Sequence, residues 1–330
     1  MKKLIKAMAT QMTQLQPNKS KYLMGVLNVT PNSFSDGGQY DREAPCFSRV
    51  KDLLSQNVNY LDCGAESTAP FNEPCSFKEE CNRFESILFP VLRKVSKDVN
   101  FRGFFELGTL SIDTYRPETF YFVANFIRGK WPHLKLLWND VSGVLDDEVS
   151  LVLKSFSNCN YVYCHNLSPS RRETQNHKLH TFKSSPSESL FLDHLYEYFN
   201  EGLDFFSREK LLTRVILDPC FGFSKTMLQN KALLNHLVVL IRSFPKEIRW
   251  LIGISRKSFL QDSVEGYRKG PKNWDVVESL HCGLLSLWFQ KLHDYTLIFR
   301  VHEPHVYYGA LQASSFFHRK ESALSLSKDI

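Results

Sequence analysis

Several patterns that would assign a chain of this size to a common class are missing from the sequence. None of the eight cysteines is spaced as a C-x-x-C pair, which argues against a zinc ribbon and a thioredoxin-like redox site. No window holds the ~18 consecutive apolar residues that a membrane-spanning helix needs. The formal net charge of +6 comes without a run of five basic residues and without a nucleic-acid-binding motif. We therefore expect neither a membrane protein nor a nucleic-acid-binding protein, and we attribute the positive excess to surface solvation.

The cysteines and the first residues bear on where the protein works. Cys63 and Cys164 lie within apolar runs, where a thiol acts as a small hydrophobic side chain. This usage is typical of a reducing cytosol. The first 21 residues include lysines but no sustained apolar stretch of the kind that a signal peptide carries. We expect a cytoplasmic protein in which residues 1–21 form a loosely held arm.

Short apolar runs recur along a chain of ordinary globular composition, with 43% hydrophobic and 23% charged residues. They are rich in β-branched and large side chains and end in polar residues, as buried parallel strands do. The eight runs are YLMGVLN (22–28), NYLDCG (59–64), TLSIDT (109–114), KLLWND (135–140), NYVYCHN (160–166), RVILDP (214–219), RWLIGIS (249–255) and TLIFRVH (296–302).

Segments with helical spacing lie between these runs. The clearest are 43–56, 78–95, 187–206, 274–291 and 304–316. Alternation of strands and helices predicts an α/β protein with a parallel sheet, and eight units is the number that closes a (β/α)8 TIM barrel. A doubly wound open sheet is the alternative, weakened because no run is followed by G-x-G-x-x-G or a P-loop. We predict one barrel domain over 22–318, a tail over 319–330, and a structureless surface excursion over 167–186.

Residues that end the runs are the candidate site residues, because active sites of such barrels lie at the carboxyl ends of the strands. A single strand-ending Asp or Asn more commonly caps the next helix or turn, but here nearly every run ends in a polar or charged side chain. We predict a shared cavity at one rim of the barrel, lined by Asp113, Asn139, Asp218, Lys257, Arg300 and His302.

These candidates form two chemical groups. The carboxylates and the Asn139 amide suit a flat, nitrogen-rich heterocycle, because a carboxylate accepts two parallel N–H bonds and an amide both donates and accepts. Lys257, Arg300 and His302 are cationic candidates for phosphate oxygens or an electron-rich ring atom. The loops NVTPNSFSDGG (28–38) and GAESTAPFNEP (64–74) contain turn residues that favour closure over a ligand. A substrate with a heterocycle at one end and a pyrophosphate at the other would match both groups.

Seven segments resemble the signatures of the dihydropteroate synthase family, in the family's order, from about residue 22 to 312. The first, MGVLNVTPNSFSDGG (24–38), is long and highly specific. The others are LDCGAEST (61–68), SIDTY (111–115), NDVSG (139–143), LDPCFGFSKT (217–226), GISRKSFL (253–260) and RVHEP (300–304). The resemblance implies a pterin-binding barrel and a Mg²⁺-assisted transferase of folate synthesis, which joins a hydroxymethyl-dihydropterin pyrophosphate to p-aminobenzoate and releases pyrophosphate. It also implies a sulfonamide target and a homodimer formed through the last helices.

The resemblance implies a role for each matching position. The pterin holders would be Asp113, Asn139, Asp218 and Lys257. The pyrophosphate group would be Asn28, Arg300 and His302, with Asn28 as the metal ligand. The p-aminobenzoate pocket would comprise Thr68, Pro70, Phe223, Lys257 and Ser258. The catalytic group would be Asp113, Asp218, Lys257, Arg300 and His302.

Simpler interpretations stand beside some of these roles. Taken alone, Phe223 is more typical of a core residue, and Ser258 could cap the helix that follows it. Lys225 is interpreted as a solvated surface lysine. Asp62 and Glu66 match positions that we interpret as structural, bracing the second loop.

The sequence departs from the family pattern in the second loop, where Ala69 stands in place of an arginine. Losing that positive charge would cost on the order of 2–4 kcal/mol of transition-state stabilisation if nothing replaces it. Cys220 and Ser224 also replace glycines. One alternative is therefore a pterin-binding homologue with weakened or lost turnover. Another is a different pterin-barrel transferase, such as a methyltetrahydrofolate methyltransferase, although the RVHEP segment and the first loop argue against it.

Overall fold

The computed structural model describes residues 21–30, 42–66, 74–182, 188–264 and 274–325. All neighbouring strands are parallel, and β8 returns to pair with β1, so the sheet closes into a barrel. The strands are β1 (Lys21–Asn28), β2 (Tyr60–Gly64), β3 (Thr109–Asp113), β4 (Lys135–Asp140), β5 (Cys159–Cys164), β6 (Val215–Asp218), β7 (Arg249–Ile252) and β8 (Thr296–Val301). The predicted (β/α)8 barrel is confirmed, and every strand overlaps the apolar run that predicted it.

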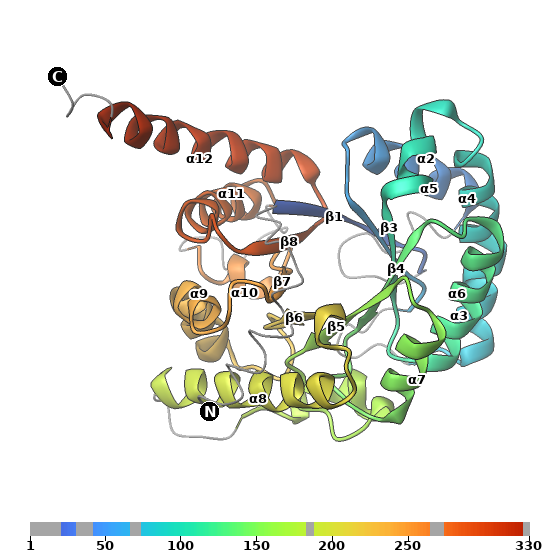
Figure 1. Cartoon of the computed structure of the whole chain (residues 1–330), viewed down its shortest axis with the longest axis horizontal. Helices are drawn as coiled ribbons and strands as arrows, with labels where there is room; N and C mark the ends of the chain where they lie inside the picture. Colours follow the sequence, from blue (N-terminus) through green and yellow to red (C-terminus); the bar gives the residue numbers. More distant parts are fainter. Residues whose placement is uncertain (1–20, 31–41, 67–73, 183–187, 265–273, 326–330) are drawn as a thin grey trace.

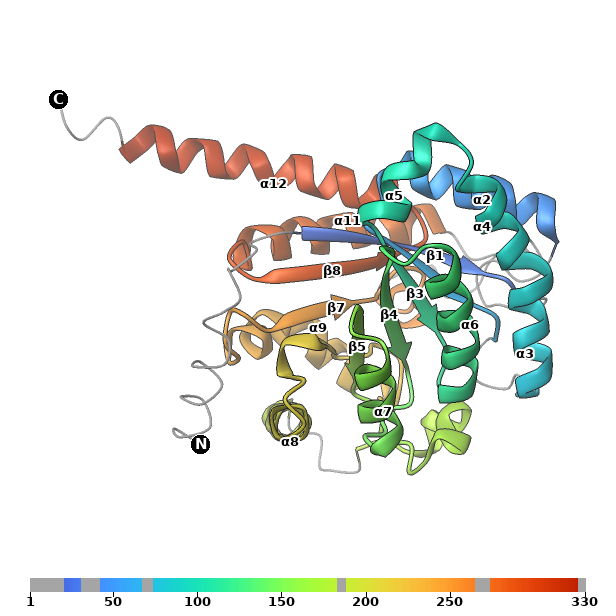
Figure 2. The ribbon, with the colours of Figure 1, turned by 45° about the vertical axis from the view of Figure 1, so that its right-hand side comes forward.

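Helices cover the outside of the barrel (Figure 1). The predicted ones are α2 (Glu43–Ser55), α8 (Glu188–Arg208), α11 (Trp274–Lys291) and α12 (Pro304–Ser325). The segment predicted over 78–95 consists of α3 (Phe77–Arg83), a π-helical turn (Phe84–Leu88) and α4 (Phe89–Val95). Helix α12 continues past the predicted domain end at 318 and projects beyond the barrel (Figure 2). None of the helices in the described ranges is both long and apolar enough to cross a membrane.

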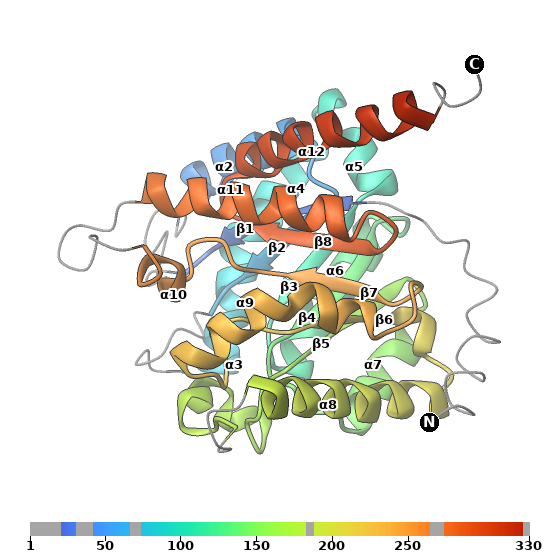
Figure 3. The same ribbon diagram turned by 90° about the vertical axis from the view of Figure 1, so that its left-hand side faces the viewer.

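Other helices were not delimited from the sequence, although several carry recognisable start signals. They are α5 (Arg102–Leu107), α6 (Pro117–Lys130), α7 (Asp147–Ser155), α9 (Met227–Arg242) and the short α10 (Ser258–Gln261). Helix α9 begins with a capping box between Thr226 and Gln229. Helix α6 begins with a proline, which suits the first helical position. Helices α8, α9, α11 and α12 follow one another along one side of the barrel (Figure 3).

The apolar residues form two clusters separated by the sheet. Inside the barrel, Met24, Tyr60, Leu137, Val162, Ile216, Leu251 and Ile298 pack together. The larger cluster lies between the strands and the surrounding helices. The two clusters follow the period of two along a strand: Leu137 belongs to the inner cluster and Trp138 to the outer one. The inward positions at the strand ends therefore remain available to polar side chains.

The predicted structureless excursion over 167–186 is wrong for the part that the structure describes. A 3-10 helix, η3 (Arg171–Leu179), packs against the barrel, and Gln175 and His177 within it are buried. Arg171 pairs with the fully buried Asp140 and, at 2.9 Å, with Asp146. Polar composition predicted a loop, but Arg171 is paired within the fold, while Arg172 and Lys178 are exposed. Residues 183–187 lie outside the described ranges.

Candidate active site

Strand register places three of the predicted site residues at neighbouring positions on the carboxyl edge of the barrel. Asn28 pairs with Gly64, Gly64 with Asp113, and Asp113 with Asn139. Gly64 has no side chain to separate its neighbours: a Cβ added there would lie 3.4 Å from Cβ of Asp113 and 3.6 Å from Oδ1 of Asn28. The Asn28 amide and the Asp113 carboxylate therefore border the same space at the end of β2.

Arg300 on β8 links the ends of β2 and β3 through two carboxylates. Its Nε donates to Asp62 at 2.7 Å and its Nη2 donates to Asp113 at 2.9 Å. The fully buried Asp62 also accepts from the Ser111 hydroxyl at 2.5 Å and from the Asn139 amide at 3.2 Å. Asp62 thus braces the ends of β3, β4 and β8, and not the second loop as interpreted from the sequence. The Nη1 group of Arg300 has no protein acceptor among the described residues, so it can still donate to an anion.

The pKa values of two site carboxyls, Asp113 on β3 and Asp218 on β6, are both raised. Burial raises the pKa of Asp113 to about 7, and the nearby Asp62 charge adds to the effect, while neighbouring cations oppose it. Burial raises the pKa of Asp218 to about 6, opposed by the Cys220 backbone N–H, which donates to Asp218 at 2.7 Å. Lys257 lowers the pKa of both carboxyls. The β3 and β6 carboxyls therefore both lie within the electrostatic influence of Lys257.

Lys257 lies between these carboxyls and an aromatic ring. Its Nζ is 5.0 Å from the centre of the Phe223 ring, and burial lowers the pKa of the amine. Phe223 packs against the His177 ring with 4.3 Å between ring centres. Phe223 is only partly buried, so it is not the core residue that the simpler interpretation expected. Ser258 is exposed and is the first residue of α10, with Lys257 at the N-cap position, so Ser258 does not cap the helix.

His302 lies beside Arg300 but is not the cationic residue that the sequence suggested. Burial, followed by the charges of Arg300 and Arg256, lowers the pKa of its imidazole well below the usual value. Its Nδ1 is 3.1 Å from the Ser255 hydroxyl oxygen, which also accepts from the His302 backbone N–H at 3.1 Å. Because that oxygen is already an acceptor, its own proton can point to Nδ1, which favours a proton on Nε2. The positive charge at the rim therefore comes from Lys257 and Arg300.

Glu66 braces the loop after β2, as interpreted from the sequence. Its carboxylate pairs with Arg116 and accepts from the Cys75 backbone N–H and from the Tyr115 hydroxyl, both at 3.1 Å. Arg116 also pairs at 2.9 Å with Glu80, a fully buried carboxylate. Burial raises the pKa of Glu80, and Arg116 opposes that effect. This ion-pair cluster holds the base of the second loop next to the rim.

Lys225 was interpreted as a solvated surface lysine, and that interpretation is wrong. The residue is only 7% exposed. Its Nζ lies 2.8 Å from Nδ1 of His165 and donates to the backbone carbonyls of Cys220 at 3.1 Å and Phe223 at 3.0 Å. Burial lowers the pKa of Lys225 to about 8. Lys225 thereby ties the loop after β6 to the end of β5, a role that only its place in LDPCFGFSKT could have suggested.

The loop after β6 contains two of the departures from the family pattern. Cys220 and Ser224, which replace glycines, have φ angles of 53° and 48°, in the left-handed region that favours glycine. Each costs on the order of 1–2 kcal/mol relative to glycine. The Ser224 hydroxyl offsets part of that cost, because it donates to Asn166 at 2.8 Å and accepts from the Leu167 backbone N–H at 2.9 Å.

Metal-binding capacity at the rim is small. Within the described ranges no three His, Cys, Asp or Glu side chains are grouped so that they could hold a metal ion. Asp62 and Asp113 are both bound by Arg300, and Asn28 adds one amide oxygen beside Asp113. Such a set fits Mg²⁺ only where ligand phosphate oxygens and water complete the coordination.

Most of the predicted site comes together at this rim, and part of it cannot be placed. Thr68 and Pro70 of the predicted aminobenzoate pocket, and Ala69, lie outside the described residues. The rim combines carboxylates for an N–H-rich heterocycle, an amine beside an aromatic ring, and a guanidinium with a donor to spare. It can therefore hold a flat heterocycle and an anionic group side by side.

Comparison with known proteins gives a consistent match. A family model described as pterin binding enzyme matches residues 24–285. The folate synthesis bifunctional protein of Arabidopsis thaliana is 30% identical over 82% of this chain and 52% of its own length. The dihydropteroate synthase of Bacillus subtilis is 31% identical over 76% of this chain and 77% of its own length. This chain thus spans about half of the plant protein and about three quarters of the bacterial one.

Solved structures match the fold. The dihydropteroate synthase of Yersinia pestis, solved with a sulfonamide drug complex, has a TM-score of 0.67 and 22% identity over 92% of this chain and 94% of its own. The Coxiella burnetii dihydropteroate synthase, solved with pteroic acid, has a TM-score of 0.67 and 22% identity over 90% of this chain and 92% of its own.

Proposed function

This chain belongs to the family of pterin-binding enzymes, and from that premise we propose that it is a dihydropteroate synthase, a transferase of folate synthesis. The reaction joins a hydroxymethyl-dihydropterin pyrophosphate to p-aminobenzoate and releases pyrophosphate. The observation that carries the proposal is the position of Asp113 and Asp218 as the last residues of β3 and β6, at the rim where Arg300 donates to Asp113 at 2.9 Å and Nζ of Lys257 lies 5.0 Å from the centre of the Phe223 ring.

Asp218 and Asp113 hold the pterin in this proposal. An ionised carboxylate accepts two parallel N–H bonds from the amino-pyrimidinone edge of the ring. Asn139, fixed by its bond to Asp62 at 3.2 Å, adds an amide oxygen that can accept. As positive charge develops on the pterin methylene carbon, the buried carboxylates stabilise it more strongly than water would.

The leaving group departs toward Arg300. The methylene C–O bond breaks and its electron pair leaves on the pyrophosphate oxygen. Nη1 of Arg300 can donate to that anion because its other nitrogens are held by Asp62 and Asp113. His302 supplies an uncharged N–H donor next to it. Mg²⁺, with Asn28 as a protein oxygen ligand, would neutralise charge on the pyrophosphate when bound.

The arylamine completes the reaction from the Phe223 side. The amine lone pair forms the new C–N bond to the methylene carbon, and the nitrogen then releases one proton to solvent. Phe223 offers a partly exposed ring face for the aminobenzoate, and Lys257, 5.0 Å from that ring, lies between the two substrates. A sulfonamide that mimics the aminobenzoate would compete for the same position.

A pyrophosphate-release assay tests the proposal. We expect release that needs both substrates and Mg²⁺, and a loss in kcat/KM of about 100-fold or more in Lys257→Ala. The matched control is Lys154→Ala, because Lys154 is an exposed lysine whose ion pair with Glu209 lies on the surface; its activity should be unchanged. Release that is independent of the arylamine, or equal rates for wild type and Lys257→Ala, would contradict the proposal.

The second candidate, a pterin-binding homologue with weakened turnover, rests on alanine at position 69. It predicts calorimetric binding of the pterin pyrophosphate without dihydropteroate in the chromatogram. Under this candidate, Ala69→Arg should raise kcat, because it restores a positive charge to the second loop. An unchanged kcat in Ala69→Arg would show that other cations already supply that charge.

Assembly and compartment complete the proposal. A homodimer would use the outer faces of α11 and α12, where Leu287, Leu311 and Phe316 are exposed by 42%, 37% and 67%. In the apolar segment 284–289, Leu285 and Trp288 pack inward on the barrel instead. All eight cysteines are free thiols, which suits a reducing cytosol. Sedimentation at several concentrations tests the dimer.

A further inference from the structure

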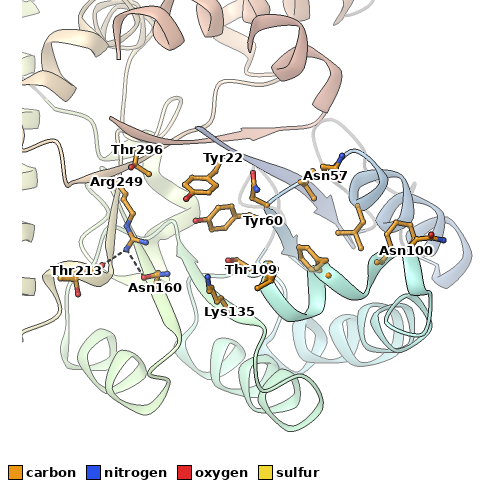
Figure 4. Close-up of a pocket in the computed structure, with 18 of the residues that line it drawn as sticks. Tyr22, Asn57, Tyr60, Asn100, Thr109, Lys135, Asn160, Thr213, Arg249 and Thr296 are labelled. Carbon is orange, nitrogen blue, oxygen red and sulfur yellow. Dashed lines mark hydrogen bonds between the residues drawn. The ribbon is translucent and has the colours of Figure 1, made fainter. Parts of the chain in front are cut away.

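The barrel carries a second polar pocket at its other end. At the amino ends of the strands, a pocket of about 600 Å³ opens between the barrel and the loops beneath it (Figure 4). The first or second residue of seven of the strands lines it. The strand residues are Tyr22, Tyr60, Thr109, Lys135, Asn160, Arg249 and Thr296. The proposed reaction gives this end of the molecule no role.

An apolar layer separates this pocket from the candidate active site. Met24, Leu137, Val162, Ile216, Leu251 and Ile298 are buried together across the middle of the barrel. Tyr22 lines the pocket while Asn28 ends the same strand, and six residues of strand span about 20 Å. A ligand in the pocket therefore contacts none of the active-site side chains, and the inference does not rest on the proposed function.

Arg249 supplies a positive charge to the pocket and forms no ion pair with Glu247, which also lines it. Only its Nη2 is held by protein, donating to the carbonyl of Thr213 at 2.9 Å and to Oδ1 of Asn160 at 3.0 Å. Among the residues that the structure describes, no carboxylate pairs with Arg249, and no protein acceptor meets its Nε or Nη1. Burial lowers the pKa of Arg249, and the phenols of Tyr60 and Tyr22 oppose that effect. A partly buried cation without a counter-ion is costly, and a bound anion removes much of that cost.

The other walls fit an organic body attached to the anionic head. Tyr22 and Tyr60 meet edge to face with 5.9 Å between ring centres, and their phenol ends point toward Arg249 (Figure 4). Lys135 is exposed and directs its amine toward the same space. Phe101 and Phe104 add apolar surface to the lining. Charge and shape together match a ring that carries one oxyanion group.

We propose that this pocket binds a small aromatic oxyanion, a carboxylate or a phosphate ester, with Nη1 of Arg249 donating to the oxyanion. The Tyr60 phenol donates to the same head group, and the ring lies against the apolar lining of Phe101 and Phe104. Lys135 adds a second, solvent-exposed charge.

Ligand-observed ¹⁹F NMR with the full chain tests the proposal. The probes are 4-fluorobenzoate and 4-fluorophenyl phosphate, which distinguish the two head groups, and 4-fluorobenzamide as a neutral analogue. We expect at least one anionic probe to bind at least tenfold more tightly than the benzamide. Arg249→Gln should weaken that binding at least tenfold. Equal binding of the neutral and anionic probes would overturn the proposal.

Two further variants keep the test decisive if Arg249→Gln fails to fold. Lys135→Met removes the exposed pocket lysine and should weaken binding at least threefold, whereas the matched surface change Lys154→Met should leave it unchanged. The anionic probes could also enter the active site. Binding that is lost in Lys257→Ala but kept in Arg249→Gln and Lys135→Met would place them there and overturn the proposal.

Discussion

Replacing Asp113 by asparagine should stabilise the folded protein at alkaline pH while it removes activity. Burial raises the pKa of Asp113 from 3.8 to about 7. The native state therefore binds the proton more tightly than the unfolded state, so stability falls as the pH rises from about 4 to about 7. One pKa unit corresponds to about 1.4 kcal/mol, so a shift of about three units amounts to about 4 kcal/mol of lost stability at pH 8.

The asparagine variant should recover only part of that free energy. Asp113 accepts a hydrogen bond from Arg300 at 2.9 Å, and an amide oxygen accepts the same bond without the ionic attraction. We therefore expect Asp113→Asn to raise the free energy of unfolding by about 1–3 kcal/mol at pH 8 and by almost nothing near pH 4. Turnover should fall by about 100-fold or more, because the variant can no longer place a carboxylate beside the pterin.

Urea unfolding followed by circular dichroism at several pH values between 4 and 8 measures this effect. The control is Asp262→Asn, an exposed carboxyl in the turn after α10, which should change stability little at any pH. The decisive quantity is the difference between variant and wild type as a function of pH. A variant less stable than wild type at pH 8, or a difference that does not grow with pH, would refute the reasoning.

Three other changes test separate parts of the structure. Arg171→Met leaves the fully buried Asp140 carboxylate without its ion-pair partner. The free energy of unfolding in chemical denaturation should fall by about 3–5 kcal/mol, and a fall below about 1 kcal/mol would contradict this. Gly202→Ala places a Cβ 2.1 Å from the Tyr163 ring, so it should lower Tm even though alanine favours helices by about 1 kcal/mol, and an unchanged Tm would count against the close packing. The kcat/KM should fall as the pH drops through about 7 and about 6, where Asp113 and then Asp218 take up a proton, and a flat profile between pH 5 and 8 would exclude ionised Asp113 and Asp218 as the pterin carboxylates.

The barrel could be predicted because its signals are local. Apolar runs of four to eight residues separated by helical segments predict parallel strands wherever they occur, and eight such units close a barrel. Helix boundaries were harder to predict from the sequence. The capping box at Thr226 and the proline at the start of α6 were legible in the sequence, but short polar helices such as η3 have no clear hydrophobic period. The packing of η3 depends on Arg171 meeting Asp140, which lies 31 residues away.

Candidate site residues could be named because a strand brings its last residue to the rim. Asn28 and Asp113 end β1 and β3, which both pair with Gly64 of β2, and Asn139 of β4 pairs with Asp113, so their proximity follows from the register. The brace at Asp62 does not follow from position alone. It needs Arg300, 238 residues away, to reach across the closed barrel.

The sequence by itself determined the barrel, the order of its strands and the identity of the polar residues at their ends, because these depend on short-range patterns. Charge states were decided by the tertiary structure. His302 is neutral and Lys225 is buried because of groups that come near them only in the folded chain. The pocket around Arg249 is also a tertiary property, since it needs the amino ends of strands from the whole chain to face one another. Electrostatic energies depend on distance and burial, and neither is set by the spacing of residues along the sequence.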